Sequence, residues 1–241
     1  MGGVLMKSRT RISYVVLKYD DETDSIYTKL LANDSRIYEV PSINYRQKDD
    51  ATFQDLKSYL LEKLIDVDTI VDENHIFIPY VQVSFEKEYI IYNYIALVLE
   101  SKYDFFTNLT TEAWNRVEYD RENSTWQLPY ERGIHEHISY RIKDYSLEDY
   151  HLDYDGNDDT IFTNVMHFIS ETTKEFPILG LMAGNKFTMK QVLHYQDLLG
   201  MDALKAGNNA TFESQYANSI QTIQDNHLTT SYKIKNEFLQ K

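Results

Sequence analysis

Several residue types that carry chemistry are scarce or missing in this chain of 241 residues. It has no cysteine, which excludes a disulfide framework, a thiolate metal site and a thiol nucleophile. It has only eight glycines, and neither a Gly-x-Ser-x-Gly elbow nor a glycine-rich phosphate-binding loop occurs among them. The sequence therefore lacks the motifs of thiol enzymes, of serine hydrolases with that elbow and of P-loop proteins.

Long apolar runs are missing as well. No run of 18 apolar residues is present, and residues 1–11 carry three basic residues but no apolar core of signal-peptide length. We therefore expect no membrane association and a cytoplasmic location. A hydrophobic content of 42% is enough for one sizeable core, with or without a small second domain.

Basic residues are too few to balance the acidic ones, and the formal net charge is -14. This argues against a general nucleic-acid binder, because phosphate contacts are made chiefly by Lys and Arg. The charge is unevenly distributed. From residue 186 to the end there are six lysines, no arginine and five acids, a net charge of +1, whereas residues 1–185 carry 18 basic and 33 acidic residues, a net charge of -15. The C-terminal part is therefore the least acidic part of the chain.

The most informative segment is a short helix predicted after Phe187. Thr188 is a favourable N-cap, and Gly200 is suited to end the helix in a left-handed conformation. Val192, Tyr195 and Leu199 fall on one face of this helix. The pattern predicts a complete amphipathic helix with its start and its end both encoded.

A second helix is predicted from Thr211 to Ile223, with Phe212, Tyr216 and Ile220 on one face. Two short helices separated by about ten residues indicate a helix-turn-helix or winged-helix module. Two amphipathic helices are also typical of an ordinary helical core, so this pattern alone does not establish DNA binding.

The first 183 residues predict an α+β fold. A helix capped by Asp49 or Asp50 carries Phe53, Leu56, Tyr59, Leu60 and Ile65 at helical spacing. A second helix is predicted over residues 161–170, after an acidic connection at 149–159. Strands are predicted at 12–19, 25–31, 38–40, 76–85, 89–99, 114–118, 124–129 and 135–144, with 76–85 and 89–99 at the centre of a sheet.

This order of elements resembles the Nudix fold, whose signature is G-x5-E-x7-R-E-U-x-E-E-x-G-U with U aliphatic. Aligned without gaps after the segment Tyr38-Glu39-Val40-Pro41, the signature falls on Ile43, Asp49, Lys57, Ser58, Tyr59, Leu61, Glu62, Leu64 and Ile65. In Nudix hydrolases the paired helix glutamates bind the Mg²⁺ that bridges a diphosphate and activates water.

The resemblance therefore preserves the frame but not the chemistry. Ser58 and Leu61 replace two of the helix glutamates, Glu62 keeps a carboxylate, and Asp49 is a shorter acid at the earlier position. One or two carboxylates on a helix do not hold the metal cluster that this reaction requires. We expect no catalytic residue, no metal site and no cofactor, with Asp49, Lys57, Ser58, Leu61 and Glu62 as remnants of the hydrolase site.

The match continues beyond the helix and resembles the bacterial Nudix-related transcriptional regulators. It is carried by the segments Tyr92–Val98, Leu152–Asp155, Phe176-Pro177-Ile178 and Phe187-Thr188, which occur in the same order and spacing. These regulators join a Nudix-like sensor domain to a C-terminal winged helix, and some bind ADP-ribose-like or sugar-derived effectors. The resemblance implies the same two parts here, with residues 1–183 as sensor and 184–241 as winged helix.

The chain departs from that family in its second winged-helix segment. The family usually has Asn-Phe-Arg-Arg-Lys there, whereas this chain has Thr211-Phe212-Glu213-Ser214-Gln215, which keeps the aromatic residue and loses the cations. Glu213 is expected to repel phosphate. Lys233 and Lys235 are expected either on a wing or in an exposed tail. The DNA-binding candidates are Thr188, Lys190, Lys205, Asn208, Asn209, Thr211, Ser214 and Gln215.

The sequence thus predicts a Nudix-like α/β/α sandwich with a mixed sheet, followed by a small winged-helix domain. The predicted function is that of an effector-responsive, DNA-binding transcriptional regulator that forms a homodimer and binds a nucleotide- or sugar-derived effector. Three alternatives remain open at this point. They are a relative that binds small molecules or proteins but not DNA, an active Nudix pyrophosphatase with a rearranged metal site, and a chance match to the family.

Overall fold

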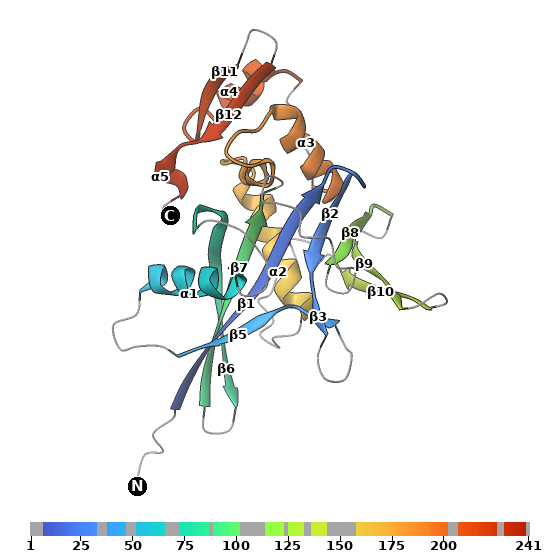
Figure 1. Ribbon diagram of the computed structural model, residues 1–241, viewed down its shortest axis with the longest axis vertical. Helices are drawn as coiled ribbons and strands as arrows, with labels where there is room; N and C mark the ends of the chain where they lie inside the picture. The colour runs from blue at the N-terminus through green and yellow to red at the C-terminus, as the bar shows by residue number, and fades with distance from the viewer. Residues whose placement is uncertain are drawn as a thin grey trace.

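The structure is a computed structural model that describes residues 7–32, 38–46, 52–65, 73–86, 89–101, 114–122, 125–132, 136–143, 158–201, 207–225 and 229–239. It contains a large mixed β-sheet with helices on both faces and a C-terminal group of helices with a β-hairpin (Figure 1). No helix in the described ranges has the length and apolar character needed to cross a membrane.

The long strand β1 (Lys7–Asp20) organises the sheet. It pairs in parallel with β7 (Tyr89–Glu100) on one side, and on the other side it pairs antiparallel with β5 (Ser42–Tyr45) and then with β2 (Ser25–Lys29). The strand order is β10-β9-β8-β2-β1-β7-β6. The remaining strands of this sheet are β6 (Ile76–Glu86), β8 (Trp114–Asp120), β9 (Thr125–Arg132) and β10 (Glu136–Lys143).

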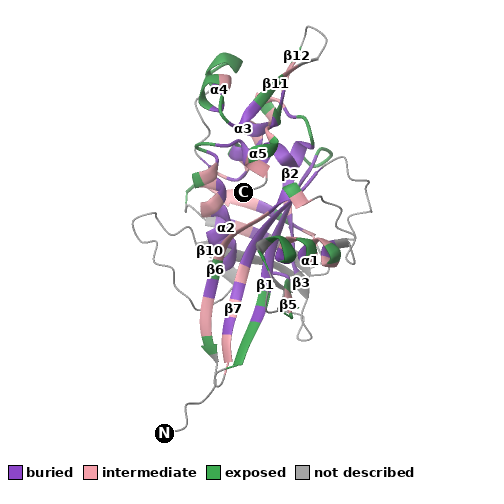
Figure 2. Cartoon of the chain, turned by 90° about the vertical axis from the view of Figure 1, so that its left-hand side faces the viewer, coloured by how far each residue is buried: buried purple, intermediate pink, exposed green. Residues whose placement is uncertain are grey.

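The alternation of side chains along β1 builds a core on each face of the sheet, because successive residues of a strand point in opposite directions. Ile12, Tyr14 and Val16 pack against helix α1 (Phe53–Ile65). Val15 and Leu17 belong to a larger cluster that includes helix α2 (Asp158–Thr172). Figure 2 shows long buried segments on the central strands β1 and β7. The predicted sandwich of a mixed sheet between helices is confirmed.

Helix α1 begins later than the sequence indicated. Thr52 is its N-cap, since its hydroxyl accepts from the amide of Asp55 at 3.3 Å and the Asp55 carboxylate accepts from the Thr52 amide at 2.6 Å. This reciprocal pair satisfies two free amides of the first turn. The predicted caps Asp49 and Asp50 lie outside the described residues. Leu56, Leu60 and Leu64 form the buried stripe of the helix.

Two predictions about strands need correction. The segment Ser42–Tyr45, which lies outside every predicted strand, forms strand β5 and pairs with β1. Strand β6, predicted at the centre of the sheet, is an edge strand. Its register shifts between Phe77 and Tyr80, around Pro79, and Phe85 is 69% exposed. Proline and an exposed aromatic residue suit an edge, where one side of the strand has no backbone partner to satisfy. Short strands β3 (Leu31–Ala32) and β4 (Tyr38–Glu39) form a separate pair.

The C-terminal part begins with the 3-10 helix η2 (Ile178–Ala183) and helix α3 (Met189–Leu198). The prediction for α3 is confirmed: Thr188 and Gln191 form a capping box, and Gly200 has φ +69°. The second predicted helix is wrong in its latter half. Helix α4 spans only Asn209–Gln215, and Ile220–Asp225 is strand β11, paired with β12 (Thr229–Ile234) and followed by α5 (Asn236–Leu239).

After Tyr216 the helical pattern ends, and buried and exposed residues alternate along the second strand of the hairpin. Ile220 is buried and Gln221 exposed on β11, while Tyr232 and Ile234 are buried on β12 with Lys233 exposed between them. A period of two residues is typical of a strand with one buried face. The order of elements is therefore helix, helix and antiparallel hairpin.

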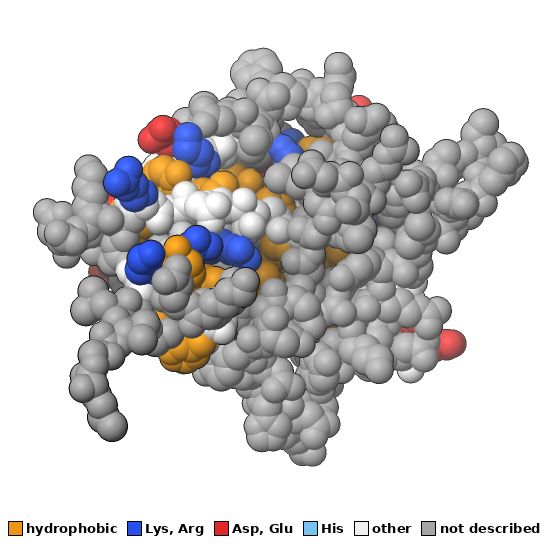
Figure 3. Space-filling view, turned by 90° about the horizontal axis from the view of Figure 1, so that it is seen from below, with side chains coloured by type: hydrophobic (Ala, Val, Ile, Leu, Met, Phe, Trp, Pro, Cys, Tyr) orange, Lys and Arg blue, Asp and Glu red, His pale blue; other side chains and the backbone are white. Residues whose placement is uncertain are grey.

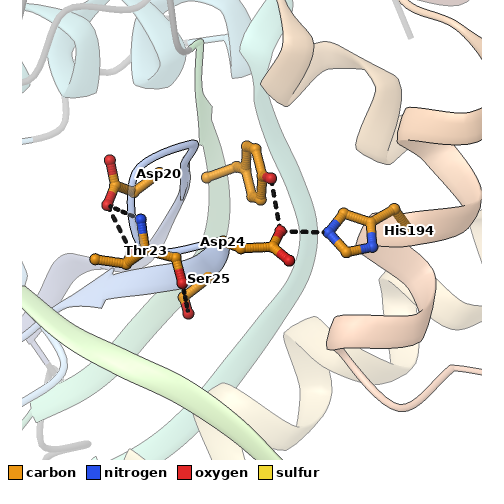
Figure 4. Close-up of polar contacts among 6 residues, drawn as sticks. Asp20, Thr23, Asp24, Ser25 and His194 are labelled. Carbon is orange, nitrogen blue, oxygen red and sulfur yellow. Dashed lines mark hydrogen bonds and ion pairs between the residues drawn. The ribbon is translucent and has the colours of Figure 1, made fainter.

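The sheet and the C-terminal part share one core. Phe187, Tyr195, Leu199 and Phe212 belong to the same buried cluster as β1 and α2. The indole Nε1 of Trp126 donates to the carbonyl of Leu199 at 2.9 Å. At the β1–β2 turn, Asp24 lies between Tyr19 and His194 of α3 and accepts a hydrogen bond from Tyr19 (Figure 4). These contacts fix α3 against the end of the sheet.

Candidate functional site

Helix α1 places Lys57, Ser58, Leu61 and Glu62, the helix positions aligned with the Nudix signature, on a partly exposed face. Ser58 donates its hydroxyl hydrogen to Oε1 of Glu73 at 2.8 Å, and Gln54 donates to Oε2 of the same carboxylate at 2.6 Å. The side chain of Glu62 is 71% exposed and lies 3.6 Å from the Lys63 ammonium. Leu61 is half-buried and packs on the core beneath α1. Glu73, in the 3-10 helix η1 (Glu73–His75), is thus held by side chains of α1.

These residues do not fit the magnesium cluster that a Nudix hydrolase carries. Ser58 uses its hydroxyl to hold Glu73, Leu61 offers no oxygen, and Glu62 points to solvent beside a lysine. Within the described ranges, no three His, Asp or Glu side chains gather closely enough to hold a metal ion. Mg²⁺ takes an octahedron of oxygen ligands, which proteins complete with carboxylates together with water and substrate phosphates. We derive no metal-dependent step from this face. Asp49 lies outside the described residues.

A basic group lies at the opposite end of the sheet from α3. Lys7, Arg9 and Arg11 alternate along β1 and are exposed, so they share one face of the strand. Arg46 follows β5 and lines a hollow of about 410 Å³ with Arg9, at the point where β5 separates from β1. Figure 3, seen from this end, shows Lys and Arg side chains gathered on the surface. The sequence analysis missed this group.

Buried amides continue the basic group across the sheet. The register aligns Arg11 of β1 with Asn93 of β7, and Asn93 with Gln82 of β6. The side-chain amide oxygen of Asn93 accepts a hydrogen bond from the hydroxyl of Ser13 at 2.9 Å. Gln82 is 4% exposed, and within the described ranges neither its amide oxygen nor its amide nitrogen has a hydrogen-bond partner. This row of one arginine and two side-chain amides lies on one face of the sheet and is suited to bind an anion that also carries polar groups.

A sequence signal for this site exists. Basic residues at positions 7, 9 and 11 repeat with the period of a strand in a strongly acidic chain, yet they precede the predicted strand at 12–19. In the sequence alone these residues bear only on a targeting segment, for which the apolar core is missing. Placing them on the sheet requires knowing that β1 begins at Lys7.

In the C-terminal part, several predicted DNA-binding residues are engaged within the fold. Thr188 caps α3, as predicted for the helix start. The Asn208 side chain caps α4 and accepts from the amide and the hydroxyl of Thr211 at 3.0 and 3.2 Å. Gln215 donates to the carbonyl of Lys174 at 3.2 Å. These contacts hold helix ends and segments together, which leaves fewer polar groups for an external partner.

The other candidates lie on the outer surface. Lys190 is exposed on α3, and Asn209 and Ser214 are exposed on α4. Lys233 is exposed on β12 of the hairpin, which agrees with the wing alternative rather than the tail. Lys205 lies outside the described residues.

Two charged residues have structural partners that the sequence did not reveal. Glu213 accepts from the hydroxyl of Tyr232 at 3.1 Å, so its carboxylate holds the hairpin against α4. Burial and then this hydrogen bond raise the pKa of Tyr232. Lys235 donates to the carbonyls of Ala217 and Asn218, both at 2.9 Å, and satisfies oxygens beyond the end of α4. Lys235 therefore stabilises the turn between α4 and β11.

No family model and no curated protein matches this sequence. Solved structures do match its fold. A MutT/nudix family protein from Enterococcus faecalis aligns with a TM-score of 0.66 and 12% identity, covering 95% of this chain and 88% of that one. The chain has a Nudix-like fold. NrtR of Shewanella oneidensis aligns with a TM-score of 0.57 and 12% identity over 96% of both chains. Its complex with a 27mer DNA aligns at 0.55 and 11%, over 96% and 95%.

These alignments confirm the predicted resemblance at the level of the fold. Because each covers nearly the whole chain, the Nudix-like sheet and the C-terminal helices and hairpin match together. The third alternative, that the resemblance arises by chance, is therefore wrong as far as the fold is concerned. The helix expected before Leu64 is present and packs on a mixed sheet.

Proposed function

We propose that this chain is a DNA-binding transcriptional regulator whose Nudix-like half is a receptor for a small effector and not a hydrolase. The observation that carries the proposal is the altered face of α1. The helix keeps its place and its cap, while Ser58 and Leu61 stand at positions where a Nudix hydrolase has metal-binding glutamates. An intact scaffold without those ligands suits binding better than hydrolysis.

The C-terminal elements support the DNA-binding part of the proposal. Two helices followed by a hairpin have the order of a winged helix, and one similar structure is of a protein complexed with DNA. We assign residues 184–241 to the winged helix and residues 1–183 to the receptor. Asn209 and Ser214 on α4 would face bases, while Lys190 and Lys233 would contact phosphates. A homodimer would place two such units on the half-sites of an operator.

The basic sheet face supports a nucleotide- or sugar-derived effector. Arg9, Arg11 and Arg46 offer planar cations that suit phosphate, and Asn93 and Gln82 offer amides for hydroxyl or base groups. We expect ADP-ribose to raise the melting temperature of the wild type, since a ligand bound only by the native form stabilises it. The variants Arg9→Ala and Arg46→Ala should lose this shift. The control Arg116→Ala, which removes an exposed arginine paired with Glu118 on β8, should keep it.

DNA binding is tested with labelled DNA from the region upstream of the chain's own gene, at low salt. The variants Lys190→Ala and Lys233→Ala should each weaken binding and reduce the slope of log affinity against log salt by about one. The control Lys63→Ala removes a lysine of α1 and should behave as wild type. Wild-type protein that leaves this DNA unretarded would favour the alternative of a small-molecule or protein-binding relative.

The pyrophosphatase alternative has its own test. Incubation with ADP-ribose and Mg²⁺ should release no AMP above the buffer control. Turnover that depends on Mg²⁺ and disappears in Glu62→Gln would show a rearranged metal site and overturn the receptor proposal. Glu62 is exposed, so this substitution should leave the fold intact.

A further inference from the structure

An apolar cavity of about 310 Å³ lies away from the basic sheet face, between α1, β6, α2 and α5. Four aromatic rings line it: Phe77 lies 6.1 Å from Phe168 and 6.3 Å from Phe176, and Phe176 stacks on Phe238 at 6.2 Å, measured between ring centroids. Mostly apolar walls with a few polar groups are typical of small-molecule sites. At ~30 Å³ for each water-sized group, the volume holds a compact molecule with about ten non-hydrogen atoms.

One cation lines this cavity. Lys57 of α1 is half-buried, and within the described ranges its ammonium has neither an ion pair nor a hydrogen bond. Burial lowers the pKa of Lys57, and the carboxylate of Glu73 opposes that shift without pairing directly with the ammonium. Glu175, the acidic residue of the lining, is exposed. A half-buried ammonium beside apolar walls is suited to a carboxylate carried on an apolar body.

The cavity wall is also held by the C-terminal part. Thr172, Glu175 and Phe176 line the cavity at the end of α2. The backbone carbonyls of residues 173–175 accept hydrogen bonds from three side chains. One of these side chains lies on α4, and the other two lie in the turn that follows α4. These are Gln215 to Lys174 at 3.2 Å, Tyr216 to Thr173 at 2.6 Å, and Ser219 to Glu175 at 3.2 Å. A molecule that presses on this wall acts on a segment bonded directly to α4.

We propose that this cavity binds a small aromatic carboxylic acid, with its carboxylate on Lys57 and its ring among the phenylalanines, and that the bound acid stabilises the attachment of α4. The site is separate from the basic sheet face and takes a different chemical class of ligand. Its regulatory meaning rests on the proposed function, whereas the binding and its effect on α4 do not. A ligand that binds only one arrangement of this wall would shift the balance between arrangements of α4.

The test uses the full chain and the probe 3-phenylpropionate, with 3-phenylpropanamide as the uncharged match. In calorimetric titrations of the wild type, the acid should bind at least about tenfold more tightly than the amide, a difference of ~1.4 kcal/mol. In Lys57→Met, which keeps the apolar stem, acid and amide should bind equally. Lys63→Met changes a lysine of the same helix outside the cavity and should preserve the preference.

A second measurement on the same samples is amide hydrogen exchange. The acid should slow exchange in residues 173–176 and also in residues 216–220, where the amides of Ser219 and Ile220 donate to the carbonyl of Tyr216. Three results would each overturn the proposed site. They are no binding of the acid, equal affinity for the acid and the amide, and acid binding that is unchanged in Lys57→Met. Protection confined to residues 173–176 would overturn the link to α4. Neither measurement contains DNA, so failure of the DNA-binding proposal would appear separately.

Discussion

Single buried charges in this chain are tied to specific partners, and Lys18 is the clearest example. Its ammonium lies 2.6 Å from the carboxylate of Glu100, and both side chains are less than a tenth exposed. The two residues are directly opposite each other on the parallel strands β1 and β7. The pair therefore fixes the register of the two central strands near their C-terminal ends.

Removing one partner should be costly. Glu100→Ala leaves the Lys18 ammonium buried without its carboxylate, and we expect a loss of about 3–5 kcal/mol in the free energy of unfolding. Glu62→Ala removes an exposed carboxylate paired with Lys63 and should change it by less than about 1 kcal/mol. Urea unfolding of both variants measures the difference, and a similar small effect for both would contradict the role given to the buried pair.

Glycine offers a second comparison at this scale. Gly200 ends α3 at φ +69°, and a Cβ there would overlap the ring of Tyr119. Gly200→Ala should therefore destabilise the fold by at least about 1–2 kcal/mol from backbone strain alone. Among the described residues, no atom lies within 4 Å of the position of a Cβ added at Gly207, so Gly207→Ala should be nearly neutral. Thermal unfolding of the two variants should separate them clearly, and equal melting temperatures would refute this reading of Gly200.

At the scale of elements, the hairpin depends on buried tyrosines. Burial raises the pKa of Tyr216 and Tyr232, so the folded chain holds these phenolic protons more tightly than the unfolded chain. Stability from this source is fully present below the ordinary tyrosine pKa of about 10 and is lost as the pH rises above it. Urea unfolding at increasing alkaline pH should show this decline, and Tyr232→Phe should reduce its slope. A pH-independent stability in this range would contradict the burial argument.

The same elements show what could be predicted from sequence. Helix α3 was predicted correctly because Thr188 and Gly200 encode its ends locally. The second predicted helix failed in its latter half because Ile220 and Ile223 continue the helical spacing of Phe212 and Tyr216, although both lie on strand β11. Pairing with β12 makes residues 220–225 a strand. The hydrogen bond from Tyr232 to Glu213 joins β12 to α4. Such long-range pairing is not visible in local spacing.

The candidate site residues likewise divide into those that the sequence predicts and those that only the tertiary fold brings together. That Ser58 and Leu61 stand where the Nudix signature has glutamates can be predicted from the sequence, because a motif defines those positions. The basic sheet face is not, since it arises from the register of β1, β7 and β6. The cavity at Lys57 brings together residues from α1, β6, α2 and α5, which only the tertiary fold makes neighbours.

At the scale of the whole molecule, the continuous core predicts a single cooperative unit. Residues on both sides of Gly184 belong to one buried cluster, and Trp126 bonds to the end of α3. We expect one calorimetric unfolding transition for the full chain, with equal calorimetric and van't Hoff enthalpies. Two separated transitions would mean that residues 1–183 and 184–241 unfold independently. Light scattering on the same sample tests the proposed homodimer by its mass.

The most direct test of the central claim is one titration of labelled upstream DNA with the wild-type chain at low salt, in the presence of Mg²⁺ and ADP-ribose. The account predicts that the DNA is bound, that ADP-ribose changes the affinity, and that the ADP-ribose is recovered intact. Unbound DNA together with cleaved ADP-ribose would contradict it and would identify the chain as a hydrolase.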